Sequence, residues 1–159
     1  MEFTRDNVIN WFANYFGSFN KYAGPLKTVP NMEKFFTPDL EFWSYNMANA
    51  VRPSTREDLL RSMVHPGLHE ELTPQYYVVD EKEKIVVVQF QLQFTDEPSE
   101  TVFPAKMASA HYHLIEDEVN ELKIKKILYF TEAQSPDEPN NLMELWAKYR
   151  DQAYAEEQS

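Results

Sequence analysis

The chain has 159 residues, a formal net charge of −11 and a 14% share of aromatic residues. Its length corresponds to about one domain, and its acidity argues against binding nucleic acid or an anionic bilayer. The absence of cysteine excludes disulfides, a thiol nucleophile and cysteine-bound zinc. Since neither a signal peptide nor an apolar run near the ~20 residues of a membrane span is present, we expect a cytoplasmic protein.

The first half of the chain is predicted to be mostly helical. Apolar and aromatic residues at helical spacing predict a first helix over 8–22, which Gly24-Pro25 ends. A loop over 26–31, a short helix over 32–36 and a strand over 40–46 are expected next. A second helix follows Pro53, because Ser54 and Glu57 have the spacing of a capping box, and Pro66-Gly67 ends it.

The second half is predicted to form strands over 75–80, 85–94, 102–115 and 122–131, joined by short polar turns. In the strand 85–94, apolar residues alternate with Gln89, Gln91 and Gln93, which is typical of a sheet with one buried face. Short turns imply an antiparallel meander. A capping box at 135–138 then predicts a last helix, with one side formed by Leu142, Leu145, Trp146 and Tyr149.

This order of elements predicts an α+β domain in which helices pack on one face of a curved antiparallel sheet. The curvature makes the space between the layers cone-shaped, and such a space tends to leave a pocket. Residues 1–134 would form this cone-shaped domain, and 135–159 an added C-terminal helix and tail of the same domain. That helix either covers the mouth of the pocket or pads the sheet or a subunit contact.

Two histidines lie two residues apart in the strand 102–115. His111 and His113 share one face with Met107 and Ser109, because side chains two apart on a strand point the same way. This face looks either into a cavity or outward, onto a wet surface or a subunit contact. A metal at this pair would need a third ligand such as Glu132 or Glu70. Because no motif fixes one, we expect no metal.

An aromatic stripe on the first helix is the second feature of interest. Phe12 and Phe16, with Phe90 and Phe94 of the long strand, fit either the wall of an apolar pocket or a filled core. Three glycines in the whole chain leave no glycine-rich phosphate loop, and we expect no cofactor.

The aromatic first helix, the segment Phe35-Phe36-Thr-Pro-Asp-Leu40 and the long final strands resemble the nuclear-transport-factor-2-like superfamily, which includes the SnoaL-like cyclases. The resemblance covers residues 4–134 and is nearest to the scytalone dehydratases. It implies a cone-shaped domain that is often dimeric through the outer sheet face and has its cavity at the open end.

The resemblance also suggests site residues. A catalytic histidine of the scytalone dehydratases falls on His69, a polar substrate-binding residue on His111, and a serine on Ser109. These matches turn His111 inward and place His113 on the same face, nearer the rim. Other positions depart from the pattern: a Tyr-Asp pair falls on Phe16-Gly17, a second histidine on Phe94, and a tyrosine on Ser44.

We therefore expect a homodimeric protein that binds a small apolar molecule. It would be a cofactor-independent dehydratase, isomerase or cyclase acting on an apolar cyclic or polyketide-like substrate, with His69 and His111 as acid and base. The alternative is a non-catalytic binding or dimerisation module of the same fold. The residues expected to contact the substrate are Phe12, Phe16, Ser44, Phe90, Phe94, Ser109, His113 and Tyr129.

Overall fold

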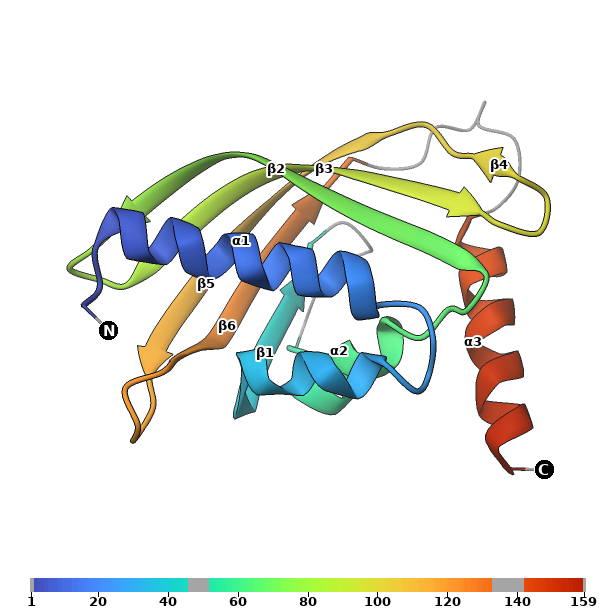
Figure 1. Cartoon of the computed structure of the whole chain (residues 1–159), viewed down its shortest axis with the longest axis horizontal. Coiled ribbons are helices and arrows are strands. Elements are labelled where there is room, and N and C mark those ends of the chain that lie inside the picture. Colours follow the sequence, from blue (N-terminus) through green and yellow to red (C-terminus); the bar gives the residue numbers. More distant parts are fainter. Residues whose placement is uncertain (1, 46–51, 133–141, 159) are drawn as a thin grey trace.

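The computed structural model describes residues 2–45, 52–132 and 142–158. In chain order its elements are α1 (Arg5–Tyr22), the 3₁₀ helix η1 (Val29–Phe35), β1 (Phe36–Ser44), α2 (Arg56–Ser62), β2 (Leu68–Asp80), β3 (Ile85–Asp96), β4 (Thr101–Val102), β5 (Lys106–Glu116), β6 (Leu122–Thr131) and α3 (Leu142–Gln158). Figure 1 shows α1 lying along the sheet, while α3 stands at the far end from the N-terminus.

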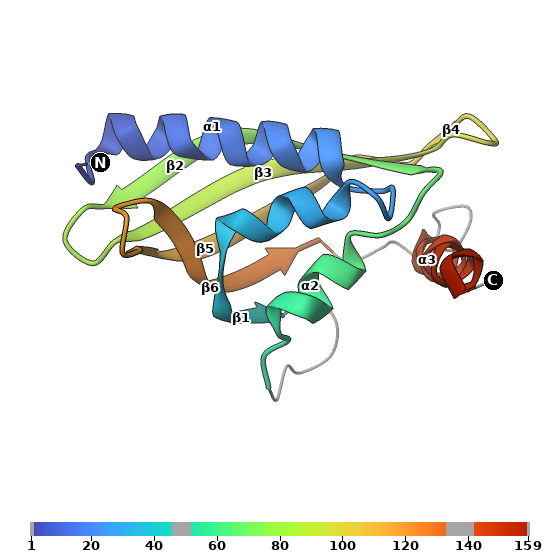
Figure 2. The same cartoon turned by 60° about the horizontal axis from the view of Figure 1, so that its bottom comes forward.

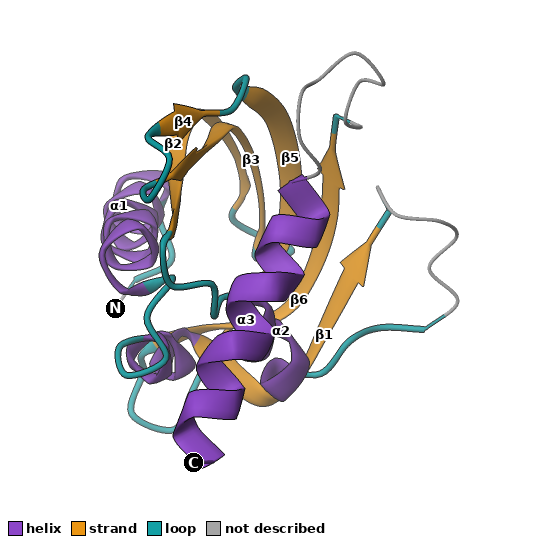
Figure 3. Ribbon diagram, turned by 90° about the vertical axis from the view of Figure 1, so that its right-hand side faces the viewer, coloured by secondary structure: helices purple, strands orange, loops and turns teal. Residues whose placement is uncertain are grey.

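The sheet has six strands in the order β1-β6-β5-β3-β2, with β4 paired to β3. Its pairs are antiparallel except for β1, which runs parallel to β6. The sheet curves around α1, and α3 crosses one end of the curve (Figure 3). This is the expected α+β architecture, helices packed on a bent sheet.

The helix α1 packs against the concave side of the sheet through its apolar stripe. Thr4 caps its start by accepting the Asn7 backbone N–H at 3.3 Å, a bond that satisfies one of the free donors of the first turn. Five side chains of the helix are buried: Val8, Phe12, Tyr15, Phe16 and Phe19. The predicted helix over 8–22 is thus confirmed and begins three residues earlier.

Two predicted boundaries in the first half are corrected. The short helix occupies Val29–Phe35 instead of 32–36, because Pro30 suits the first turn of a helix. The capping box of α2 consists of Thr55 and Asp58, one residue beyond the predicted pair. Ser54 cannot cap the helix because its backbone pairs with Phe42 of β1, at 2.8 and 2.9 Å.

The strands also differ from the prediction at two places. β2 begins at Leu68, seven residues before the predicted start, and it passes Pro74 at a bulge. Proline is tolerated there because β2 is an edge strand that pairs only with β3. The predicted strand 102–115 is split into β4 and β5 around Pro104, which has no N–H to donate.

The alternation predicted for 85–94 is confirmed. Val86, Val88, Phe90, Leu92 and Phe94 are buried, while the residues between them are half-buried on the other face. In α3, Leu142, Leu145, Trp146 and Tyr149 pack against the core as expected. The capping box predicted at 135–138 lies outside the described residues.

The free edge of β2 is covered by one side chain of α1. The Asn20 amide donates to the Leu72 carbonyl at 2.9 Å, and its oxygen accepts the Leu72 N–H at 2.8 Å. The amide therefore takes the place of a neighbouring strand and ties the end of α1 to the sheet.

We predict that Asn20→Ala lowers the free energy of unfolding by about 1–3 kcal/mol, because it leaves two part-buried backbone groups of Leu72 without their partner. Chemical denaturation measures this. The control is Asn14→Ala at an exposed position of the same helix, which should be neutral or slightly stabilising because alanine is the better helix former. Equal effects of the two substitutions would contradict the role of Asn20.

Candidate functional site

The histidine face of β5 is the outer face of the sheet. His111 lies opposite Val87 and His113 opposite Ile85, on the same side as the half-buried glutamines of β3. The residues between them, including Ala110 and Tyr112, are the ones that face α1. The prediction that His111, Ser109 and His113 turn inward is therefore wrong, since the small and aromatic residues of β5 occupy the interior.

His69 lies on the outer face as well. It is paired with Thr95, whereas its neighbour Glu70 is paired with the buried Phe94. Directly paired residues of an antiparallel sheet point to the same side, so Glu70 faces the interior and His69 does not. The acid–base role assigned to His69 and His111 remains a prediction, but these residues lie outside the cone.

The predicted aromatic residues do meet inside the cone. Phe12 lies 5.0 Å from Tyr112 and 6.0 Å from Phe16, and Phe16 lies 5.6 Å from Phe90, measured between ring centroids. All four side chains are buried. They fill the space beneath α1, where each such ring pair adds about 0.5–1.5 kcal/mol beyond its buried area.

Half-buried rings gather toward the α3 end of the interior. Tyr129 of β6 lies 5.8 Å from Phe42 of β1 and 6.2 Å from Phe90. Ser44 is paired with Tyr129 in the β1–β6 register. Trp146 of α3 lies 5.3 Å from Phe94. Phe42, Tyr129 and Trp146 are only partly buried, whereas the rings beneath α1 are fully buried.

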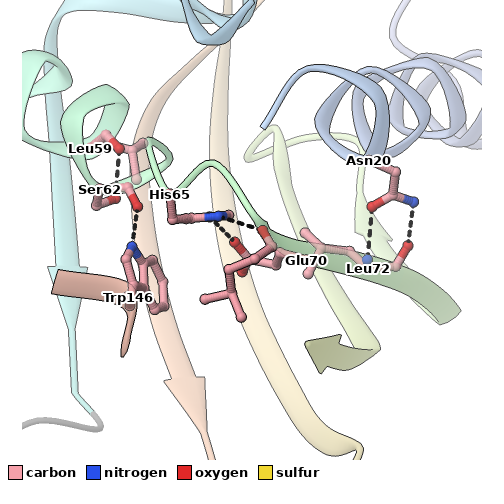
Figure 4. Close-up of polar contacts among 8 residues, drawn as sticks. Asn20, Leu59, Ser62, His65, Glu70, Leu72 and Trp146 are labelled. Atoms are coloured by element: carbon pink, nitrogen blue, oxygen red, sulfur yellow. Dashed lines mark hydrogen bonds and ion pairs between the residues drawn. The ribbon is translucent and has the colours of Figure 1, made fainter. Parts of the chain in front are cut away.

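A buried histidine–carboxylate pair lies beside these rings. His65 follows α2 and is completely buried, and its Nε2 lies 3.1 Å from Oε1 of Glu70 (Figure 4). Its Nδ1 lies 2.8 Å from the carbonyl oxygen of Leu68. Because a carbonyl only accepts hydrogen bonds, Nδ1 carries a proton. Nε2 is therefore the nitrogen that exchanges its proton with Glu70.

Two competing effects set the pKa of His65. Burial alone lowers the pKa, because it disfavours the imidazolium. The hydrogen bond and the negative charge of Glu70, helped by the Leu68 carbonyl, outweigh burial and raise the pKa above its ordinary value of 6.5. The protonated form of His65 is therefore favoured relative to that of an isolated histidine.

Neighbouring elements fix the position of the pair. The Trp146 ring meets His65 edge-on at 5.1 Å, and its indole N–H donates to the Ser62 carbonyl at 2.8 Å (Figure 4). Through this contact, α3 closes one side of the site. On the other side, the bonds between Asn20 and Leu72 hold β2 two residues beyond Glu70.

Phenol hydroxyls complete the interior. Burial, followed by the charge of Glu70, raises the pKa of Tyr15 and of Tyr129 above the ordinary 10.0. Both phenols, already protonated at neutral pH with an ordinary pKa, therefore stay protonated further into the alkaline range and can donate a hydrogen bond. Tyr129 is the one beside the half-buried end.

The sequence reasoning missed this pair. Glu70 was considered only as a candidate metal ligand, and no role was assigned to His65. The signal that could have identified it is the alternation Leu68, Glu70, Leu72, which extends β2 toward α2 and turns Glu70 inward.

A metal has no evident place among the described residues. Within 2–45, 52–132 and 142–158, no three histidine, aspartate or glutamate side chains gather closely enough to hold an ion. Glu70 is bound to His65, and Glu132 accepts the Met107 N–H. None of the helices in these ranges has the length and hydropathy that crossing a bilayer requires.

Comparison with solved structures assigns the fold. AusH from Aspergillus nidulans is similar with a TM-score of 0.65 and 16% identity, covering 90% of each chain. An NTF2-like protein from Anabaena variabilis has a TM-score of 0.58 and 14% identity, covering 84% of this chain and 96% of its own. A Catenulispora acidiphila protein in complex with S-DNPA has a TM-score of 0.54 and 16% identity, covering 78% of this chain and 90% of its own.

The chain thus has the nuclear-transport-factor-2-like fold, as the order of its elements predicted. No family model and no curated protein matches the sequence.

We predict that His65 titrates above 6.5 in histidine NMR spectra, and that its pKa falls in Glu70→Gln, which removes the charge that raises it. His113 serves as an internal control: partial burial, then Lys126 and Lys125, lower its pKa. Because the folded-state pKa of His65 exceeds the unfolded one, its contribution to stability is complete below pH 6.5 and is lost as the pH rises through the folded-state pKa. The difference in free energy of unfolding between the wild type and His65→Gln should therefore shrink as the pH rises. A difference that grows with pH would contradict this pairing.

Proposed function

We propose that this protein binds a small apolar molecule at the α3 end of its interior and transfers protons to and from it through His65 and Glu70. The reaction would be of the dehydratase, isomerase or cyclase kind and would need no cofactor. The observation that carries this proposal is the buried pair itself, in which the Leu68 carbonyl fixes Nδ1–H and leaves Nε2 to exchange its proton with Glu70.

The pair suits proton transfer next to a carbonyl group. The Glu70 carboxylate would take a proton from the carbon beside the carbonyl, while His65 keeps a proton available on Nε2. The Tyr129 phenol, which is neutral at pH 7 and whose pKa burial raises further, would donate a hydrogen bond to the oxygen on which negative charge develops. Returning the proton to another carbon shifts the double bond, and protonating a leaving hydroxyl releases water.

The rings around the pair favour an apolar cyclic or polyketide-like substrate. Phe42, Tyr129 and Trp146 offer partly exposed ring surfaces, and flat hydrophobic molecules pack well against such walls. A similar structure, the Catenulispora acidiphila protein, is in complex with S-DNPA, and small-molecule binding by this chain is in keeping with that likeness.

A binding module without chemistry is the second candidate. The packing of Phe12, Phe16, Phe90 and Tyr112 beneath α1 favours it, because these rings already occupy the space that a deeply bound substrate would need. His65 would then be a structural residue that joins α2 to β2.

Hydrogen–deuterium exchange at the carbons beside the carbonyl of 2-tetralone, a flat apolar ketone, distinguishes the candidates. In deuterated water the wild-type protein should accelerate exchange of the α-protons, followed by proton NMR. His65→Gln and Glu70→Gln should each slow the catalysed exchange by about 10²–10⁴-fold, the usual worth of a general acid or base.

The matched control is Glu71→Gln, which changes an exposed neighbour on the opposite face and should leave exchange unchanged. Circular dichroism verifies that each variant is folded. A loss of exchange in His69→Gln and His111→Gln with none in His65→Gln would support the assignment made from sequence. Binding of 2-tetralone without any exchange would favour the binding module.

We also propose that the chain forms a homodimer through the outer face of the sheet. This face carries a row of aromatic rings: Tyr45 stacks on Phe130 at 5.0 Å and on Trp43 at 6.5 Å, and His111 lies 5.5 Å from Phe130. Tyr45 is 45% exposed and Phe130 40%. Contiguous exposed apolar surface of this kind is a common mark of a protein interface.

Light scattering coupled to size exclusion tests the dimer. Phe130→Glu should shift the protein from dimer to monomer, because it would bury an unpaired charge in the contact. Val119→Glu makes the same change in the turn between β5 and β6, where Val119 is 70% exposed, and should leave the mass unchanged. A wild-type monomer at all accessible concentrations would refute the dimer.

A further inference from the structure

A surface groove, separate from the interior, lies where η1, β1, α2 and the β5–β6 turn meet. This basic groove has a volume of about 570 Å³ and is lined by Pro30, Glu33, Lys34, Phe36, Thr37, Pro38, Arg56, Asp117 and Lys123. It shares no residue with the His65–Glu70 site. Figures 1 and 2 show the β5–β6 turn and α3 at opposite ends of the molecule.

The groove gathers positive charge on an acidic protein. Three cations, Lys34, Arg56 and Lys123, line it from three separate elements, although the chain as a whole carries −11. The Lys123 ammonium is held at the rim by the Lys34 carbonyl, at 2.6 Å. Such convergence has an electrostatic cost unless an anion offsets it.

The carboxylates of the groove do not offset all of this charge. Nη2 of Arg56 lies 3.6 Å from Glu33 and 3.4 Å from Glu57, so the charge of Arg56 is fully paired. Asp117 accepts the backbone N–H groups of Val119 and Glu121, at 3.0 and 2.9 Å, and thereby holds the turn. On the side of the groove lined by Lys34 and Lys123, the one lining carboxylate is that of Asp117, so two positive charges face one negative charge there.

Thr37 gives an independent indication at the same place. Across the described ranges, its Oγ1 is the one buried side-chain nitrogen or oxygen without a hydrogen-bond partner. Buried polar groups are nearly always paired, and an exception calls for an explanation. The β1–β6 pairing breaks register between Phe36 and Glu41, which parts the two strands beside Thr37.

We propose that the basic groove binds an organic carboxylate. Its apolar body would rest on the exposed Pro30 and Pro38 above the buried Phe36. Its carboxylate would lie between Lys34 and Lys123, and the Thr37 hydroxyl, buried and unpaired in the structure, would turn about its Cα–Cβ bond to donate a hydrogen bond to it. One negative charge matches the single excess cation, whereas a phosphate dianion would leave one charge unmatched.

Titration of the whole chain with benzoate, followed by amide NMR, tests the groove. Benzoate should give saturable shifts for residues 30–38 and 117–123, and benzamide, its neutral counterpart, should give none. Lys123→Gln should weaken benzoate binding about tenfold, the worth of one charge-assisted hydrogen bond. Lys82→Gln makes the same charge change in the distant β2–β3 turn and should leave binding unaltered.

Thr37→Val provides a second test with two opposite readouts. Replacing an unpaired buried hydroxyl by a methyl group should raise the midpoint of thermal unfolding without ligand, and yet weaken benzoate binding about tenfold. The proposal would be overturned by benzoate shifts that do not saturate, or by equal shifts with benzamide or with inorganic phosphate. An unchanged benzoate affinity in Lys123→Gln would overturn it as well.

Discussion

The packing of the aromatic stripe of α1 against the concave face of the sheet is the contact on which the rest of the structure depends. Phe12 and Phe16 lie against Tyr112 of β5 and Phe90 of β3, so one helix joins the two central strands. Because the rings of α1 are fully buried against these strands, the half-buried rings of the interior lie beyond them, on β1, β6 and α3. The position of the candidate site therefore follows from how far the rings of α1 extend along the sheet.

The elements that could be predicted from sequence are those whose side chains repeat with one clear period. The strand around Phe90 alternates without interruption, and α1 keeps its stripe over five turns. Prediction was weaker where a long-range backbone hydrogen bond sets the start of a helix. The Ser54 backbone pairs with β1, and the capping box is therefore at Thr55. No local pattern reveals such a long-range bond.

The site was predicted only in part, and the reason is physical. The aromatic residues reached the interior because burial of large rings is strongly favourable. The histidines of β5 did not, because Ala110 and Tyr112 compete for the interior and leave His111 outside. Glu70 points inward, and in the sequence it interrupts the pattern of apolar residues expected for a buried strand face. Its carboxylate is tolerated there because His65, at the end of α2, pairs with it.

The amide of Asn20 also bears on how copies of this protein can meet. β2 ends the sheet with 13 residues of strand, and a bare edge of that length is a template for joining another chain. Asn20 occupies both edge groups of Leu72, Arg5 donates to the Tyr77 carbonyl at 3.3 Å, and Pro74 has no N–H to offer. Association through continuous strands is thereby discouraged, because a strand from another chain would have to displace these groups before it could pair with β2.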